Sequence, residues 1–336
     1  MEGFGIDFGT TNSLVAHFNA DDLYVQPFVD KNGNPHPSVV WLESDGKCTV
    51  GDKARRHINE YSGQPGHMFI PSIKRKLGMD FSHSFSGNKF SAVDIASKIF
   101  HFLKTNAHQE FNKDVQNAVV SIPVDFQGVA RRELRQAAAN AGIYISGYVH
   151  EPFAAVVAYA HSQKAILQES ALRDQNILVF DWGGGTLDIT VAQVLEKAIF
   201  QKSKGGLLDR AGDNFDDMIK GYGKRRFMEQ YGLKPEELNV SDGTRDRFRL
   251  EAERAKIELS QASSASLNLT DLMRRDGEYL DYSDRIERKT FEEMIAQDLQ
   301  LAMHQVDHAI EEAGLSASQI DRVLLVGGTS NIPAVK

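Results

Sequence analysis

The chain has 336 residues and a mass of 37.4 kDa, and at about 150 residues per domain this length predicts two domains or one two-lobed unit. Its net charge of −8 argues against a nucleic-acid binder, which usually carries a basic excess. The single cysteine, Cys48, excludes an intramolecular disulfide and a cysteine-based zinc cluster. No apolar run approaches the roughly 18 residues of a membrane span, and no signal peptide is recognisable, so we expect a cytoplasmic protein.

Strand-like and helix-like segments alternate along the chain, which predicts an α/β fold. Polar interruptions at residues 168–176 and 210–213 are interpreted as joints between lobes or subdomains. In chain order, the sequence predicts strands at 3–8 and 39–42, a helix at 93–110, a strand at 118–122, helices at 128–141 and 153–162, strands at 177–181 and 187–194, helices at 215–230, 245–261 and 291–313, and a strand at 322–326.

One segment of the sequence occurs twice in outline. FGIDFGTT, residues 4–11, returns as VFDWGGGT, residues 179–186. In each copy an apolar strand ends in Asp, followed by a large apolar residue, glycine and threonine, and then by a second strand-like run. A duplicated architecture with one such hairpin in each lobe is the economical interpretation.

These two hairpins have the features of phosphate-binding turns. Glycine permits the close backbone approach that a phosphate oxygen needs, and the backbone N–H groups of such a turn are open. Asp7 and Asp181 could hold Mg²⁺ through water molecules, since Mg²⁺ loses its hydration shell reluctantly. The alternative is a pair of ordinary β-hairpins with Asp as a turn former, and the repetition argues against it.

A second pattern lies on the helix predicted at 245–261. Glu253, Lys256, Ile257 and Ser260 fall on one stripe, where polar groups could bind the hydroxyls of a ribose. A salt-bridged surface helix would give the same pattern. Farther on, the apolar run 323–326 leads into a double glycine suited to covering an adenine ring or a sugar, although a buried strand with a glycine turn explains it equally.

The sequence does not match the other nucleotide-binding, kinase or metal-binding motifs that parts of it suggest. The sequence contains no P-loop pattern, and no G-x-G-x-x-G follows a strand. Asp7-Phe8-Gly9 spells the kinase D-F-G, but the preceding kinase motifs are missing. Residues 30–34 lack the glycine and glutamate positions of a calcium loop. His304 and His308 are four residues apart, which is more typical of a solvated helix face than of a metal site.

Taken together, the motifs GIDFGTTNSLV, VVSIPVDF, HEPFAAVVAYA, VFDWGGGTLDITV, EAERAKIELS and IDRVLLVGGTSNIP resemble the DnaK-type (heat-shock protein 70) chaperones, and look closest to their YegD-like branch. The resemblance runs from Gly3 to Pro333. It implies an actin-like ATPase fold, α/β, with two lobes that each hold a mixed five-stranded-type sheet, and with ATP and Mg²⁺ in a cleft between them. The first lobe is expected at 1–174, with a small outer subdomain at 36–91; the second is expected at 175–336, with its small subdomain at 210–289.

The resemblance also implies roles for individual residues. Lys74 matches the catalytic lysine that contacts the γ-phosphate, although from the residues alone 74–76 would be an exposed basic cluster. Glu151 matches the carboxylate that helps to position water and metal, and Pro123 and Arg131 match a pair that relays the nucleotide state. The phosphate hairpins are matched by Asp7, Gly9, Thr10, Thr11 and Asn12, and by Asp181, Gly183, Gly184, Gly185, Thr186 and Asp188. The adenosine site is matched by Gly212, Glu253, Lys256, Ser260, Gly327, Gly328 and Thr329.

The sequence departs from the family pattern at the base site. Ile257 and Asn331 stand where typical members have arginines that pack on the adenine, and Ala211 replaces a glycine near the phosphates. We therefore expect weaker nucleotide binding and poor discrimination between adenine and guanine. The chain is also expected to lack the C-terminal helix, linker and peptide-binding domain of typical members, and with them a client peptide site.

The function implied is that of a slow ATPase domain, which turns ATP and water into ADP and phosphate as a conformational timer. Expected partners, by resemblance only, are a J-domain co-chaperone and a nucleotide-exchange factor; nucleic acid and membrane are not expected. Three alternatives stay open: a nucleotide-binding pseudo-ATPase, an actin-like scaffold, and a sugar or acetate kinase of the same superfamily.

Overall fold

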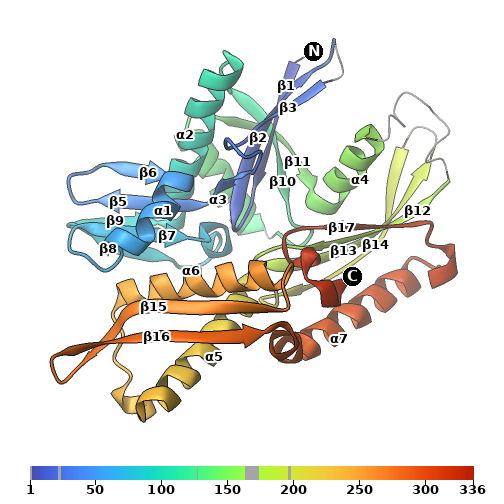
Figure 1. Ribbon diagram of the computed structural model, residues 1–336. Coiled ribbons are helices and arrows are strands. Elements are labelled where there is room, and N and C mark those ends of the chain that lie inside the picture. Colours follow the sequence, from blue (N-terminus) through green and yellow to red (C-terminus); the bar gives the residue numbers. More distant parts are fainter. Residues whose placement is uncertain (1, 22–23, 127, 163–173, 196–197) are drawn as a thin grey trace. The chain divides into compact units, whose positions relative to one another are not determined.

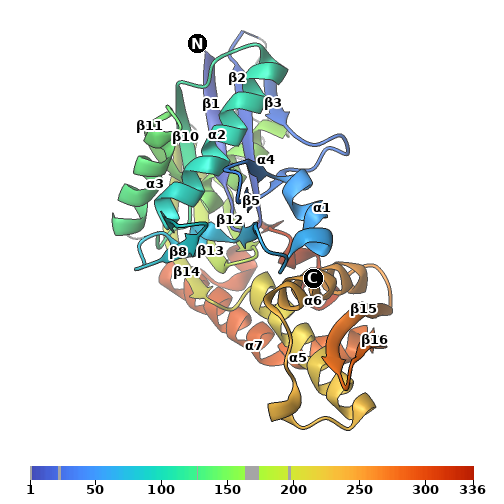
Figure 2. The same cartoon turned by 90° about the vertical axis from the view of Figure 1, so that its left-hand side faces the viewer.

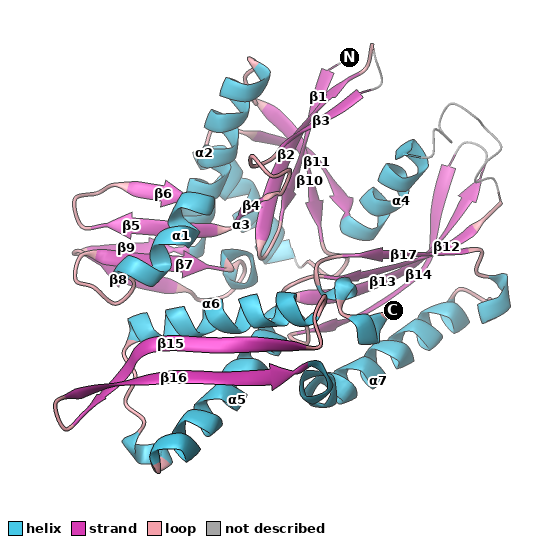
Figure 3. Cartoon of the chain, in the orientation of Figure 1, coloured by secondary structure: helices cyan, strands magenta, loops and turns pink. Residues whose placement is uncertain are grey.

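The computed structural model describes residues 2–21, 24–126, 128–162, 174–195 and 198–336 (Figure 1). It divides into two compact units, the first made of Met1–His57 and Pro65–Ala154, the second of Ile58–Gln64 and Ala155–Lys336. Both are mixed α/β, as the sequence predicted (Figure 3). The lobes and subdomains expected from the resemblance have other limits than these two compact units, and those limits stay a prediction.

The first unit is built on a mixed sheet of six strands in the order β11-β10-β1-β2-β3, with β4 paired to β2. Helices α2 and α3 lie side by side on one face of this sheet (Figures 1 and 2). Smaller sheets, β6-β5-β7 and β8-β9, complete the unit. Its elements are β1 (Glu2–Phe8), β2 (Asn12–Asn19), β3 (Tyr24–Phe28), β4 (His36–Pro37), β5 (Val39–Glu43), β6 (Cys48–Val50), β7 (His67–Pro71), β8 (Ser82–Phe85), β9 (Asn88–Ser91), α2 (Ala92–Phe111), β10 (Asn117–Ile122), α3 (Gly128–Asn140) and β11 (Tyr144–His150).

Local sequence explains why α2 begins where it does. The Ser91 hydroxyl accepts a hydrogen bond from the backbone N–H of Asp94, whose carboxylate in turn accepts from the backbone N–H of Ser91. This capping box satisfies two backbone donors that the helix itself cannot pair. The apolar face of α2 then packs on the sheet, where Phe100 stacks on Phe8 with ring centroids 4.8 Å apart. Phe8 is fully buried, and it directly precedes the first glycine turn.

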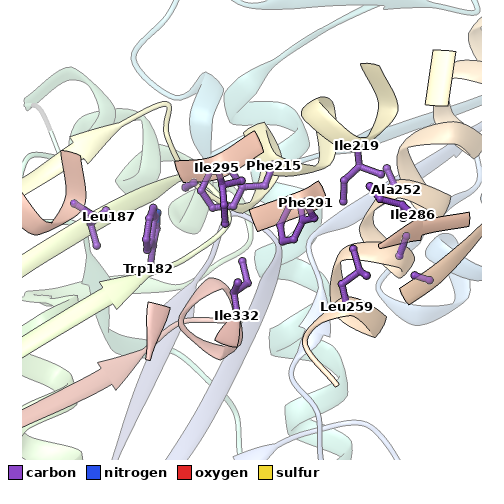
Figure 4. Packing of buried hydrophobic residues seen from close by; sticks show 14 of the residues in the cluster. Trp182, Leu187, Phe215, Ile219, Ala252, Leu259, Ile286, Phe291, Ile295 and Ile332 are labelled. Atoms are coloured by element: carbon purple, nitrogen blue, oxygen red, sulfur yellow. The ribbon is translucent and has the colours of Figure 1, made fainter. Parts of the chain in front are cut away.

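The second unit holds a four-stranded sheet in the order β14-β13-β12-β17. Its main core joins Trp182, Phe215 and Phe291, whose rings meet edge to face (Figure 4). Its elements are β12 (Asn176–Trp182), β13 (Thr186–Leu195), β14 (Ala198–Leu208), α5 (Gly212–Tyr231), α6 (Asp242–Leu259), β15 (Ser264–Arg275), β16 (Glu278–Glu287), α7 (Arg288–Glu312) and β17 (Arg322–Val326). Helices α1 (Asp52–Tyr61) and α4 (Glu151–Ser162) each contribute residues to both units.

The two sheets share one strand pattern. In the first unit, β1 runs parallel to β10 and antiparallel to β2, and β2 runs antiparallel to β3. In the second unit, β12 likewise runs parallel to β17 and antiparallel to β13, and β13 runs antiparallel to β14. The internal echo in the sequence therefore reflects a repeated arrangement of strands. Over the described residues the two main sheets have six and four strands, where the resemblance implied a five-stranded-type sheet in each lobe.

Candidate functional site

The first hairpin lies at the carboxyl end of β1. Phe8 pairs with Ser13, which leaves the four residues Gly9 to Asn12 as the turn. A Cβ on Gly9 would lie 2.0 Å from the carbonyl oxygen of Asn12, so that only glycine fits this turn. Ser38 fixes the turn, because its Oγ donates to the Gly9 carbonyl over 2.9 Å and its N–H donates to the Thr11 carbonyl over 2.8 Å. Thr10 and Thr11 therefore lie on a rigid turn.

Parallel strands bring further polar residues to the same edge of the sheet. Strands β1, β10 and β11 run parallel, and Asp7 is in register with Ser121. The Ser121 hydroxyl donates to Asp7 Oδ1 over 2.7 Å, and Ser121 is buried. This contact fixes the rotamer of the exposed Asp7 carboxylate. Sequence reasoning missed Ser121, although a hydroxyl within the apolar run Val119 to Ile122 was a usable signal.

Lys74, which is buried, and Glu151, which is partly exposed, form an ion pair in the first unit. Lys74 lies on the short helix η1 (Ile73–Lys76) and is only 6% exposed, and its Nζ lies 2.6 Å from Glu151 Oε1. Glu151 follows the last residue of β11, so its position is set by the parallel strands. The side chain of Lys76, two residues on, is exposed. The interpretation of residues 74–76 as an exposed basic cluster is therefore wrong for Lys74, because tertiary packing buries its stem.

The second hairpin repeats the first. Trp182 pairs with Leu187, again leaving a four-residue turn, Gly183 to Thr186. The N–H of Gly183 donates to the Thr186 carbonyl over 3.0 Å. The Thr186 hydroxyl donates to Asp188 Oδ2 over 2.8 Å, and Asp188 is buried. Asp181 occupies the strand position equivalent to Asp7, one residue before the large apolar side chain.

Three distant segments meet at this second hairpin. The Thr329 hydroxyl donates to the Gly183 carbonyl over 2.7 Å. The N–H groups of Gly212 and Asp213, at the start of α5, donate to the carbonyls of Gly183 and Gly184 over 3.1 and 2.8 Å. The hairpin is thus joined to the N-terminus of α5 and to the turn that follows β17. Predicted phosphate and adenosine residues lie together here.

Lys256 joins α6 to this assembly. Its Nζ donates to the Gly212 carbonyl over 2.9 Å and lies 2.8 Å from Asp216 Oδ1. Asp216 is 3% exposed, and burial raises its pKa from 3.8 to about 7, against the lowering effect of Lys256. The Ser260 hydroxyl donates to the Lys256 carbonyl over 3.3 Å, and Glu253 adds negative charge close to Asp216. Sequence reasoning identified Lys256 but missed Asp216.

The two residues that depart from the expected base site are both exposed. The side chain of Ile257 on α6 is 52% exposed. Asn331 is exposed as well, and its side-chain amide donates to the Gly328 carbonyl over 3.3 Å. Ile257 can therefore offer a flat ligand only aliphatic contact.

The donor set fits Mg²⁺ held largely by water and phosphate. Within the described part of the chain, no three or more His, Cys, Asp or Glu side chains are grouped so that they could hold a metal ion. Asp7 lies at the first hairpin, and Asp181 lies opposite Asp188 at the second; such hard oxygen ligands suit Mg²⁺, which keeps several waters and substrate phosphate oxygens. In the same described ranges, no helix is long and apolar enough to cross a membrane.

The predicted site residues thus fall into two groups, one in each unit, and each group is built around an Asp-ended strand and a glycine turn. A comparison with protein-family models matches residues 81–336, well over half of the chain, to the Hsp70 protein family. The matched range includes Glu151, the whole second hairpin, α5, α6 and the loop after β17. Because this match covers more than half of the chain, the chain belongs to the Hsp70 family, whose nucleotide-binding domains are generally ATPases that bind ATP and ADP with Mg²⁺.

Proposed function

We propose that the chain is the ATP-binding and slowly ATP-hydrolysing nucleotide domain of a DnaK-type chaperone of the YegD-like branch. The observation that carries this proposal is the ion pair of the buried Lys74 with Glu151, whose Nζ and Oε1 atoms lie 2.6 Å apart although the residues are 77 positions apart. A buried ammonium is costly unless it is paired, and an ammonium held in a fixed direction is suited to stabilise charge on a phosphoryl group.

Hydrolysis in this proposal depends on positioning rather than on covalent chemistry. Backbone N–H groups of the two glycine turns, among them those of Gly184 and Gly185, would bind phosphate oxygens, whereas the Gly183 N–H is already used within its turn. The Lys74 ammonium stabilises charge that develops on the γ-phosphoryl oxygens, and Glu151 fixes the direction of that ammonium and accepts a hydrogen bond from the attacking water. Mg²⁺, when bound, would neutralise negative charge on the phosphate. Asp7 and Asp181 would hold it through water, and Ser121 keeps the Asp7 carboxylate in place.

On the adenosine side, the proposal assigns sugar and base contacts to Glu253, Lys256, Ser260, Gly328 and Thr329. Their support is the set of contacts that join Lys256 and Thr329 to Gly212 and Gly183. The remaining members of this group, Gly212 and Gly327, allow the close approach of neighbouring backbone.

Hsp70 proteins generally act with J-domain proteins and nucleotide-exchange factors. We propose both as partners in the cytoplasm, with the exchange factor on the segment 210–289, which holds α5, α6 and the β15–β16 hairpin. Turnover would be slow, as suits a timer for chaperone conformations.

Two measurements test this function. Calorimetric titration with ATP and ADP, with and without Mg²⁺, should give binding that strengthens with Mg²⁺. Phosphate release should then fall at least tenfold in Lys74→Ala and stay at the wild-type rate in Lys76→Ala, whose side chain is exposed on the same short helix. Binding without any phosphate release would favour the pseudo-ATPase, and transfer of labelled phosphate to a small acceptor would favour a kinase. Equal release from Lys74→Ala and wild type would refute the role of Lys74.

A further inference from the structure

Helix α5 is the support of the second phosphate hairpin. Its first two N–H groups donate to the carbonyls of Gly183 and Gly184, at 3.1 and 2.8 Å. A small displacement of the first turn of α5 must therefore move the hairpin, because these carbonyls and the N–H groups offered to phosphate belong to the same peptide units. What fixes this first turn then decides the geometry of the phosphate site.

Lys256 fixes that turn from outside the helix. Its Nζ lies 2.9 Å from the carbonyl oxygen of Gly212 and 2.8 Å from Asp216 Oδ1. Gly212 and Asp216 are four residues apart and thus on the same face of α5. A Cβ at Gly212 would lie 3.1 Å from this Nζ and 2.8 Å from Thr329 Oγ1, so the close approach requires glycine. One ammonium group thus bridges the start of α5 to its second turn.

Asp216 supplies the carboxylate that pairs with Lys256. Its side chain is 4% exposed, whereas that of Asp217, the next residue, is 61% exposed. The charged groups that act on Asp216 are Lys256 and Glu253 from α6 and Asp213 on its own helix. Burial raises the pKa of Asp216 to about 7, so its ionisation changes in the physiological pH range.

We propose that Asp216 is a positioning residue for the nucleotide: in its ionised form it holds Lys256 against the Gly212 carbonyl and so keeps the Gly183–Thr186 hairpin in the geometry that binds phosphate. This inference rests on the proposed function, since it assumes that the hairpin binds nucleotide. Protonation of Asp216 removes the charge that holds Lys256, and the first turn of α5 loses its restraint. Nucleotide affinity then falls as the pH drops below 7.

The expected size follows from the titration. If the protonated form binds poorly, one pH unit below the pKa leaves about a tenth of the molecules competent, and the apparent Kd for Mg²⁺–ADP rises about tenfold between pH 8 and pH 6. The experiment is calorimetric titration of Mg²⁺–ADP at pH 6, 7 and 8 with saturating Mg²⁺. Wild type is compared with Asp216→Asn and with Asp217→Asn, the matched control on the exposed side of the same helix.

Asp216→Asn should bind Mg²⁺–ADP about tenfold more weakly than wild type at pH 8 and lose the pH dependence, whereas Asp217→Asn should match wild type at every pH. The nucleotide's own protonation is common to all three proteins and cancels in the comparison. Asp216→Asn that binds like Asp217→Asn, with the same pH dependence as wild type, would overturn the proposal.

Lys256→Met keeps the proposal testable if Asp216→Asn does not fold. Because Asp216 acts through Lys256, the Lys256→Met protein should bind weakly and show no dependence on pH, and a second substitution at Asp216 should weaken it no further. A wild-type pH dependence that survives in Lys256→Met would overturn the proposal. Wild type that fails to bind nucleotide at any pH would refute the proposed function itself, whereas wild type that binds without pH dependence would refute only the role of Asp216.

Discussion

The two glycines that follow β17 should respond differently to the same substitution. Gly327 has a φ of +82°, and a Cβ there would lie 2.3 Å from the Trp182 carbonyl oxygen and 2.8 Å from Asp181 Oδ1. Gly328 has a φ of −65°, and a Cβ there would meet nothing within 4 Å. We therefore predict that Gly327→Ala disrupts the second hairpin, whereas Gly328→Ala leaves the fold intact.

The loss of stability expected for Gly327→Ala is the sum of two free-energy costs. A left-handed backbone costs an L-residue about 1–2 kcal/mol, and forcing an extra methyl into a filled site costs about 1–3 kcal/mol more. In a unit of this size, 1 kcal/mol shifts the Tm by roughly 2–4 °C, so Gly327→Ala should melt about 4–20 °C below wild type. Gly328→Ala should melt within about 2 °C of wild type, because its backbone is already in the right-handed helical region.

Nucleotide titration separates structure from binding. If Gly328 borders the nucleotide, the added methyl occupies space that the ligand needs, and Kd for Mg²⁺–ADP should rise about tenfold at unchanged stability. The assay is thermal unfolding followed by the fluorescence of Trp182 in a Trp41→Phe background, with calorimetry on the same samples, since the chain has two tryptophans. Equal melting temperatures for the two alanine variants would refute the steric reasoning.

Three further predictions concern single side chains. Ser121→Ala removes the hydrogen bond that orients Asp7, so the Mg²⁺ concentration for half-maximal phosphate release should rise severalfold, and an unchanged Mg²⁺ dependence would contradict this role. Ile257→Arg should tighten ATP binding by up to about thirtyfold and sharpen the preference for ATP over GTP, since guanidinium stacking contributes roughly 0.5–2 kcal/mol; competition binding measures this, and equal preference in both proteins would refute it. The folded state binds the Asp216 proton more tightly than the unfolded chain, because its pKa is raised from 3.8 to about 7. The free energy of unfolding should therefore fall as the pH rises from 4 to 7, and Asp216→Asn should abolish this fall in urea unfolding measured at several pH values.

Asp216 would then lower the stability of the folded protein and improve its binding of nucleotide. A buried carboxylate with a raised pKa weakens the folded state at neutral pH, yet its charge holds Lys256 in place. Such opposition between stability and function is common where a binding site needs a group in an unfavourable environment.

Local sequence was sufficient for much of the fold. Each predicted helix and strand has a counterpart in the described residues, because apolar periodicity and caps such as Ser91 act over a few positions. The glycine turns after Asp7 and Asp181 were also readable, since a turn depends on the residues within it. The sequence analysis did not predict α1, β11, β14 or the β15–β16 hairpin, among other elements. In β15 the signal was present, because the buried residues Ala265, Leu267 and Leu269 alternate with less buried ones.

Only the tertiary structure decided which of these residues act together. The sequence indicated Asp7 but not Ser121, 114 positions away, which orients it. Lys74 looked like part of an exposed basic run, and packing buried it against Glu151. Asp216 looked like any acidic residue on a surface helix until α5 and α6 met and removed it from water. Secondary structure follows from neighbours along the chain, whereas burial, and with it the charge state and pairing of these groups, depends on which distant segments fold together.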